Sequence, residues 1–152
     1  MAARVEVLSE TQEPVSKSLV ELISAVCRAA VERAGIDQDV EFACLLTDGP
    51  AMRRLNRQFR AIDRETDVLA FARDESAPGG DIAIAIDQAL AAADSNGSTV
   101  EAEVAYLAAH AALHLLGHDH HSDDDYERML VEEDEVLAII GVANPRRSEE
   151  TD

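Results

Sequence analysis

The chain has 152 residues, of which 47% are hydrophobic and 3% aromatic, and its formal net charge is −18. This composition suffices for one ordinary hydrophobic core, so we expect a single domain over residues 1–143 and a flexible tail over 144–152. The acidity argues against a general nucleic-acid-binding protein, because such proteins usually carry a basic surface.

Targeting signals are not apparent in the chain. The N-terminus has no apolar segment of the kind that a secretory signal needs, and no stretch approaches the roughly 20 apolar residues of a membrane span. Cys27 and Cys44 fit reduced, buried thiols better than a disulfide framework. We therefore expect a cytoplasmic protein without a membrane partner.

Strands and helices alternate along the chain. Hydrophobic periodicity, turn residues and capping residues predict the following elements. Strands are expected over 4–8, 40–46, 68–71 and 82–86, and helices over 15–34, 50–59, 87–94, 99–116 and 122–140. Residues 78–80 are expected to form a turn and 95–98 a loop. The predicted fold is α+β, a single domain in which a small mixed β-sheet of about four strands packs against about five helices, with a metal site at a helix end.

The histidines carry the main chemical signal. All five lie between His110 and His121, and His110, His114 and His120 are spaced by four and then six residues. Residues four apart share one face of a helix, with Cβ atoms about 5–6 Å apart, so His110 and His114 can bind one metal ion. Gly117 can adopt the left-handed conformation that ends a helix, which lets the chain bring in His120. Three nitrogens and one open position are typical of a catalytic zinc site, and we expect one zinc ion per chain.

The histidines allow two other interpretations. Scattered helix and loop histidines would not cluster in so short a segment; His118 and His121 fit the spacing less well and are expected to be solvated or to lie beside the ligands. The same spacing occurs in metzincin peptidases, whose first histidine is followed by a glutamate general base. Ala111 holds that position here and cannot accept a proton, so a peptidase would need another base, such as one from the acidic run 119–125.

Three segments carry a resemblance to a known family. Residues 110–120, HAALHLLGHDH, closely resemble the H-G-x-L-H-L-x-G-x-D-H motif of the YbeY family, metal-dependent bacterial endoribonucleases. Residues 55–71, LNRQFRAIDRETDVLAF, are similar to its L-N-x2-[YF]-R-x2-D-x-P-T-D-V-L-S-F, and residues 80–84, GDIAI, resemble its G-D-I-x-I strand. The chain departs from the family at Glu65, Ala70 and Ala111, where the family has proline, serine and glycine, and none of these changes removes a proposed ligand.

The resemblance implies a function and partners. It implies a single-strand-directed endoribonuclease that acts in ribosomal RNA maturation, at the 3′ end of 16S rRNA, and in ribosome quality control. The implied substrate is a ribosomal RNA precursor. The implied partners are the small ribosomal subunit and a ribosomal protein or ribosome-associated GTPase. The resemblance also aligns Arg60 with the arginine of the family's active cleft.

Arginines form a second pattern. Arg53, Arg57, Arg60 and Arg64 step by four, three and four residues, and on a helix that ran so far they would form one stripe. We interpret the stripe as a phosphate-binding surface; the alternative is the solvated face of an amphipathic helix. Acidic residues instead concentrate over 119–135, after the histidine motif.

A mechanism follows as a hypothesis. The zinc ion, with His114 as a central ligand, would lower the pKa of a water and polarise a phosphoryl oxygen. Arg60 would bind the phosphate and the charge that grows on it. The attacking group, water or the RNA 2′-hydroxyl, stays open at this point. Asp119 is interpreted as a residue that orients one imidazole, or equally as a cap of the bend, while Asp63 and Asp67 are expected to tether the Arg60 loop.

Two competing classes remain beside the nuclease. One is a different zinc metallohydrolase, such as a peptidase. The other is a non-catalytic ribosome-assembly factor whose acidic last helix would bind a basic partner. We favour the enzyme, and the sequence leaves its oligomeric state open.

Overall fold

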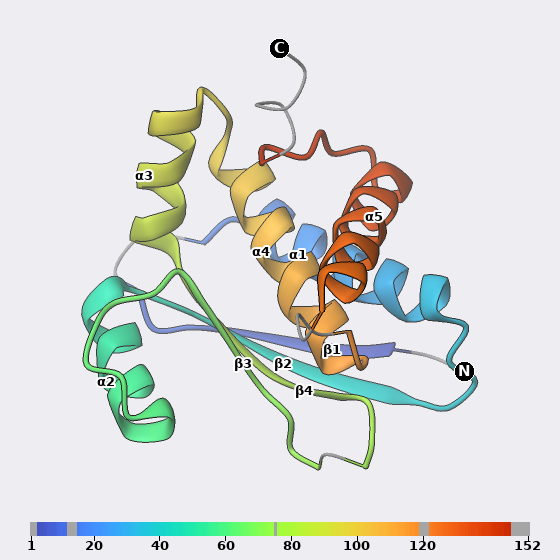
Figure 1. The fold of residues 1–152 in the computed structure, drawn as a ribbon. Helices are drawn as coiled ribbons and strands as arrows, with labels where there is room; N and C mark the ends of the chain where they lie inside the picture. The colour runs from blue at the N-terminus through green and yellow to red at the C-terminus, as the bar shows by residue number, and fades with distance from the viewer. Residues whose placement is uncertain (1–2, 12–14, 75, 119–121, 147–152) are drawn as a thin grey trace.

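The structure is a computed structural model that describes residues 3–11, 15–74, 76–118 and 122–146. Within these residues the chain forms four strands and five helices, which confirms the expected α+β class (Figure 1). In chain order these elements are β1 (Ala3–Ser9), α1 (Lys17–Ala34), β2 (Val40–Thr47), α2 (Gly49–Arg60), β3 (Val68–Phe71), β4 (Gly79–Ala85), α3 (Ile86–Asn96), α4 (Val100–Leu115) and α5 (Asp123–Ile139).

The sheet is mixed, as expected. Its strand order is β1-β2-β4-β3; β1, β2 and β4 run parallel, and β3 pairs antiparallel with β4. The helices α1 and α4 cover one face, and α2 lies on the other face beside β3 (Figure 1). On the α2 side, Met52 packs with Ala83 and Ala85 in a small separate cluster. The sheet therefore holds α2 and α4 at the edge formed by β3 and β4.

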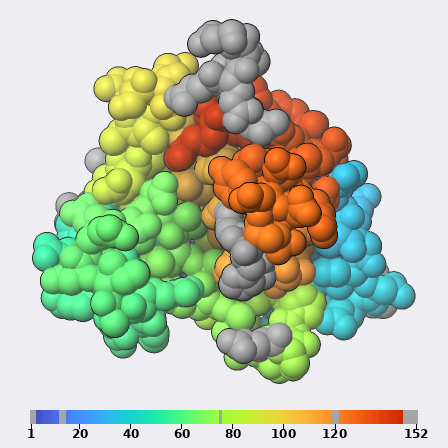
Figure 2. Space-filling view, viewed as in Figure 1, coloured from blue at the N-terminus to red at the C-terminus, as the bar shows by residue number. Residues whose placement is uncertain are grey.

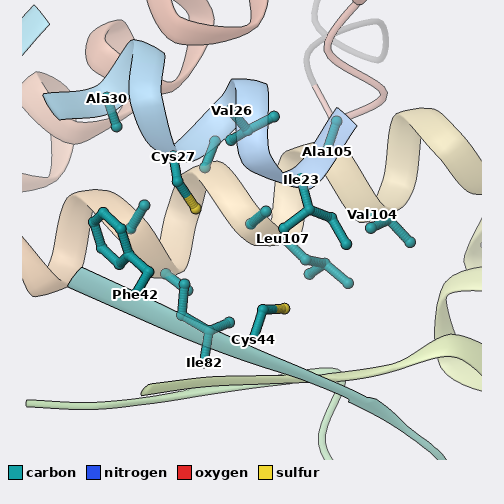
Figure 3. Close-up of a cluster of buried hydrophobic side chains, with 14 of the residues drawn as sticks. Ile23, Val26, Cys27, Ala30, Phe42, Cys44, Ile82, Val104, Ala105 and Leu107 are labelled. Carbon is teal, nitrogen blue, oxygen red and sulfur yellow. The ribbon is translucent and has the colours of Figure 1, made fainter. Parts of the chain in front are cut away.

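The main core lies between the sheet and α1 and α4. Alternate residues of β2, among them Phe42 and Cys44, are buried on this face, as the two-residue period of a strand requires. Figure 3 shows them meeting Ile23 and Cys27 of α1 and Leu107 of α4. Both cysteines are buried and unpaired, as expected, and burial raises the pKa of the Cys27 thiol to about 12. None of the described helices combines the length and apolar character that a membrane crossing requires.

Several element boundaries differ from the prediction. Gly79 and Gly80, expected in a turn, begin β4, while Ile86, expected to end that strand, begins α3. Gly80 has φ 148°, and a Cβ there would press on the carbonyl oxygen of Phe71, so only glycine lets the two strands approach so closely. The first helix begins at Lys17 because the Ser16 hydroxyl caps it by accepting from the Leu19 N–H.

The first part of the expected tail is bonded to the domain. Arg146 donates from Nε to Oε1 of Glu103 at 3.3 Å, and its guanidinium lies 4.8 Å above the centre of the Tyr106 ring. Glu103 is fully buried, and its other oxygen accepts from Asn96 and Ser98. Arg146 thus pairs a buried carboxylate on α4, while residues 147–152 lie outside the described part of the chain.

We predict that Arg146→Ala destabilises the domain. The change leaves Oε1 of the buried Glu103 without its arginine, which costs about 1–3 kcal/mol of unfolding free energy. Urea denaturation measures the effect. Arg128→Ala, at an exposed arginine of α5, is the control and should change stability by no more than about 0.5 kcal/mol. Equal stability of the two variants would show that the Arg146 side chain contributes nothing to the unfolding free energy.

Candidate active site

Helix α4 carries two of the three proposed metal ligands. The Thr99 hydroxyl caps its start by accepting from the Ala102 N–H. Ten of its residues are buried, so the helix is fixed on most sides. His110 is half-buried and His114 is exposed, one helical turn apart on the same face. The helix thus presents both imidazoles along the strip of its surface that the core leaves uncovered.

The helix ends as Gly117 predicts. The Gly117 N–H bonds the carbonyl of His114, and the His118 N–H bonds the carbonyl of Leu113, which together satisfy the last turn. Gly117 has φ 108°, in the region that favours glycine. The chain therefore turns sharply after the second histidine. The proposed ligand His120, the proposed orienting residue Asp119, and His121 lie outside the described residues.

The two described ligand candidates, His110 and His114, face a cleft that also contains Arg60. A cavity of about 1090 Å³ is lined by Arg60 and His114 together with Ala70, the loop 76–78 and residues 115–118. A smaller cavity of about 210 Å³ is lined by Arg60, Ala70, His110 and His114 and by neighbouring residues of β3. The cavities meet at Arg60, Ala70 and His114. Figure 2 shows this face, with a hollow between α2 and α5.

The Arg60 side chain is held at the wall of the cleft. Its Nη2 donates to the carbonyl oxygen of Ala70 at 2.5 Å, and its guanidinium lies 5.1 Å above the centre of the Phe71 ring. Because the acceptor is a backbone atom, the serine-to-alanine departure at position 70 leaves this bond intact. Ala61 follows in the left-handed conformation, φ 58°, and ends α2 directly after the arginine.

The other arginines of the predicted stripe are not brought to the cleft wall. The helix ends at Arg60, so Arg64 lies beyond it, and its carbonyl accepts from Asn56. Arg53 donates to Asp63 at 2.7 Å, and Arg57 lies 3.9 Å from the same carboxylate. The hydrogen bond from Arg53 lowers the pKa of Asp63. The condition for one helical stripe is therefore not met, although Arg53 and Arg57 are exposed on α2.

Glu133 is a site residue that sequence reasoning missed. It lies on α5, is 1% exposed, and its Oε2 is 2.6 Å from Nδ1 of His110. Its Oε1 is buried without a hydrogen-bond partner among the described residues. On the other side of His110, the Tyr106 ring stacks at 6.1 Å between ring centres, and burial together with the Glu133 charge raises the pKa of Tyr106 to about 12.

The helical period of α5 contains the signal that could have identified Glu133. Its position falls four residues after Met129 and four before Leu137, and both of these are buried. A glutamate on the apolar face of an amphipathic helix indicates a buried carboxylate with a partner. The signal is hard to recognise because Glu133 stands in a run of acidic residues. Its neighbours Glu132, Asp134 and Glu135 do not lie on the buried face of the helix.

The remaining family departures are accommodated within the fold. Ala111, which replaces a glycine, is 1% exposed, packs in the core and also lines the smaller cavity. Glu65, which replaces a proline, accepts from Gln88 of α3 at 2.9 Å and so ties the loop after α2 to that helix. Among the described residues neither cavity has a carboxylate in its lining, so the base that a peptidase requires is not found there.

The fold is that of a small α+β protein whose cleft brings guanidinium and imidazole groups to one cavity, an arrangement suited to binding a phosphate group. Residues 5–141 match the family model of endoribonuclease YbeY. The chain is 35% identical to the endoribonuclease YbeY of Desulforamulus reducens, over 93% of this chain and 99% of that protein. It is 30% identical to that of Bacillus mycoides, over 93% and 99%.

A solved structure agrees with these relatives. The solution structure of a Thermotoga maritima protein superimposes with a TM-score of 0.63 at 27% identity, covering 97% of each chain. The chain thus belongs to the YbeY family of endoribonucleases, and it is a nuclease, a hydrolase that acts on RNA.

We predict that Ala61→Gly stabilises the protein. Ala61 holds a left-handed conformation in which its Cβ is strained, and glycine relieves that strain at a helix end, raising the unfolding free energy by about 0.5–1 kcal/mol. Thermal and urea denaturation measure this gain. Ala91→Gly, inside the exposed face of α3, is the matched control and should lose about 1 kcal/mol. Loss of stability in both variants would contradict the strain at Ala61.

Proposed function

We propose that this protein is a zinc-dependent, single-strand-directed endoribonuclease that acts in the cytoplasm on ribosomal RNA precursors. Its proposed roles are maturation of the 3′ end of 16S rRNA and ribosome quality control. One observation carries the proposal: His110 and His114 of α4 line the same cavity as Arg60 of α2. Membership in an endoribonuclease family gives that cavity its substrate class.

The residues fit a zinc ion by their donor chemistry. Imidazole nitrogens suit zinc, and one turn of α4 separates the two described donors. Among the described residues no group of three metal-binding side chains is found, and the third proposed ligand, His120, lies outside them. We therefore propose His110, His114 and His120 as the ligands of one ion, with the sequence spacing as the support for His120. We also propose, from its place in the sequence between two histidines, that Asp119 is a partner of one imidazole.

The proposed work of the chain's own residues centres on Arg60. When bound, zinc supplies a Lewis acid that lowers the pKa of water and polarises a phosphoryl oxygen. The Arg60 guanidinium, whose planar set of donors suits a phosphate, is held by the Ala70 carbonyl and the Phe71 ring. Little reorganisation is then needed when it meets a phosphate and the charge that develops on it.

The charge distribution limits how RNA approaches. The exposed acidic residues of α5 repel phosphate, while Arg53, Arg57 and Arg60 lie on α2, on the other side of the hollow. We propose that the RNA backbone follows the α2 side, with Arg53, Arg57 and Arg64 as outer contacts. The acidic face of α5 instead suits a basic protein, which supports the proposed association with the small ribosomal subunit through a ribosomal protein or a ribosome-associated GTPase.

We predict that His114→Ala and Arg60→Ala separate metal binding from turnover. His114→Ala removes a ligand and should lose zinc and RNA cleavage together. Arg60→Ala should keep the fold and the zinc but lower the cleavage rate by about 10²–10³, the usual effect of removing one transition-state donor. Zinc content and single-turnover cleavage of an unstructured RNA measure the two effects, and the chemistry of the product ends reports whether water or a 2′-hydroxyl attacks.

The control for this experiment is Arg54→Ala. Arg54 lies on the same helix and is exposed, but it lines neither cavity, so its removal should leave the rate within about twofold of the parent rate, a free-energy change of only a few tenths of a kcal/mol. If Arg60→Ala cleaves RNA as fast as Arg54→Ala, the role given to Arg60 is wrong. If His114→Ala retains full cleavage, the proposed metal site is wrong.

We predict opposite effects on RNA affinity for Arg53→Ala and Asp63→Asn. Each phosphate contact on a single strand contributes about 0.7 to the slope of log affinity against log salt, so Arg53→Ala should flatten the slope by about that amount. Asp63→Asn removes the carboxylate that pairs with Arg53 and Arg57, and should therefore steepen the slope and tighten binding. Titrations of an RNA in the absence of metal, at several salt concentrations, measure the affinity and the slope for both variants. Arg4→Ala, at the β1 edge, is the control and should change neither the affinity nor the slope.

A further inference from the structure

We propose that Glu133 is the positioning residue of the metal site: it fixes the tautomer and the ring orientation of His110, so that Nε2 is the nitrogen that binds the ion. This inference rests on the proposed zinc site and assigns a role to a residue of α5. The observation behind it is the 2.6 Å contact between Oε2 of Glu133 and Nδ1 of His110, made by a carboxylate that is 1% exposed.

Burial of Glu133 is costly, and stability does not explain it. Glu103 and Glu133 are the two buried carboxylates among the described residues. Glu103 bonds Asn96 and Ser98 through one oxygen and Arg146 through the other. Glu133 has its bond to His110, and its Oε1 has no partner in the described part of the chain. A buried carboxylate that is only half satisfied lowers stability, so a functional reason for keeping it is expected.

The chemistry of the contact determines which ring nitrogen binds metal. A neutral imidazole has one N–H and one lone pair, and a metal takes the lone pair. An ionised carboxylate can only accept, so the N–H that faces Glu133 is on Nδ1. The lone pair is then on Nε2. Carboxylate–histidine pairs of this kind also raise the basicity of the ligating nitrogen, and their loss typically weakens metal binding 10–100-fold.

The ring of His110 is also held from its face. Tyr106 stacks on it with an angle of 28° between the ring planes, and Arg146 lies over the Tyr106 ring. Glu133 therefore contacts the edge of the imidazole from α5, and Tyr106 contacts its face from one turn earlier on α4. These contacts leave the ring little freedom to rotate. The geometry of the proposed site thus depends on the docking of α5 against α4.

Zinc affinity and the nitrogen chemistry of His110 test this role without any measurement of activity. Zinc affinity is measured by competition with a chelator for the parent, Glu133→Gln and Glu133→Leu. We expect about tenfold weaker binding for Glu133→Gln, which keeps an acceptor, and up to about 100-fold for Glu133→Leu, which removes it. In the zinc-loaded parent, nitrogen NMR should show the proton of His110 on Nδ1 and the metal on Nε2.

Glu103→Gln is the matched control, because it makes the same change at the other buried glutamate. We expect it to lower stability without changing zinc affinity. Glu133→Leu should remain folded, since it replaces a half-satisfied buried carboxylate with an apolar side chain. The parent's NMR assignment tests the tautomer independently of how any variant folds.

The outcomes separate this inference from the proposed zinc site. If the parent binds zinc and His114→Ala does not, but the Glu133 variants bind it as tightly as the parent, only the role of Glu133 is overturned. The same holds if the metal is found on Nδ1 of His110. If the parent binds no zinc, the zinc site and the role of Glu133 fail together.

Discussion

The burial of α4 is the constraint on which the rest of the structure depends. The helix packs against the sheet and against α1, α3 and α5, and its many small alanines let these elements approach closely. One strip of its surface remains uncovered, and His110 and His114 lie on it. The same packing fixes where α5 can deliver Glu133 and where β3 can hold Arg60. The positions of His110, His114 and Arg60 in the cleft are therefore a consequence of how one helix is enclosed, and loop residues complete the lining of the larger cavity.

The net negative charge of the chain is compatible with an RNA substrate because the arginines of α2 are separated in space from the acidic residues of α5. A protein of net charge −18 repels RNA on average, so affinity must come from a small number of placed cations. Asp63 pairs with Arg53 and Arg57, and Arg60 is bonded to a backbone carbonyl instead of a carboxylate. The printed bond of the Arg60 guanidinium is thus to a neutral backbone acceptor and not to an acidic side chain that would compete with a phosphate.

The sequence predicted the elements whose signals are local. The strand over 40–46, the helix starts at Thr99 and Ser122, and the glycine after α4 have signals in neighbouring residues, and all are found in the structure. Contacts between distant segments were not predictable in this way. The need for glycine at position 80 comes from the close approach of β3. The position of Arg64 is set by where α2 ends, and the contact of Glu133 with His110 is set by how α5 packs on α4. Each of these is decided by packing that no single window of sequence contains.

The central claim is that one cleft holds a single zinc ion on three histidines and keeps one position open. Zinc-edge X-ray absorption of the purified protein tests it most directly. We predict one zinc per chain, surrounded by three imidazole nitrogens and one oxygen at about 2.0–2.1 Å. A sulfur ligand at about 2.3 Å would contradict it, because it would draw Cys27 or Cys44 out of the core. A second metal at about 3.5–4 Å would contradict it equally, since it would require a two-metal mechanism.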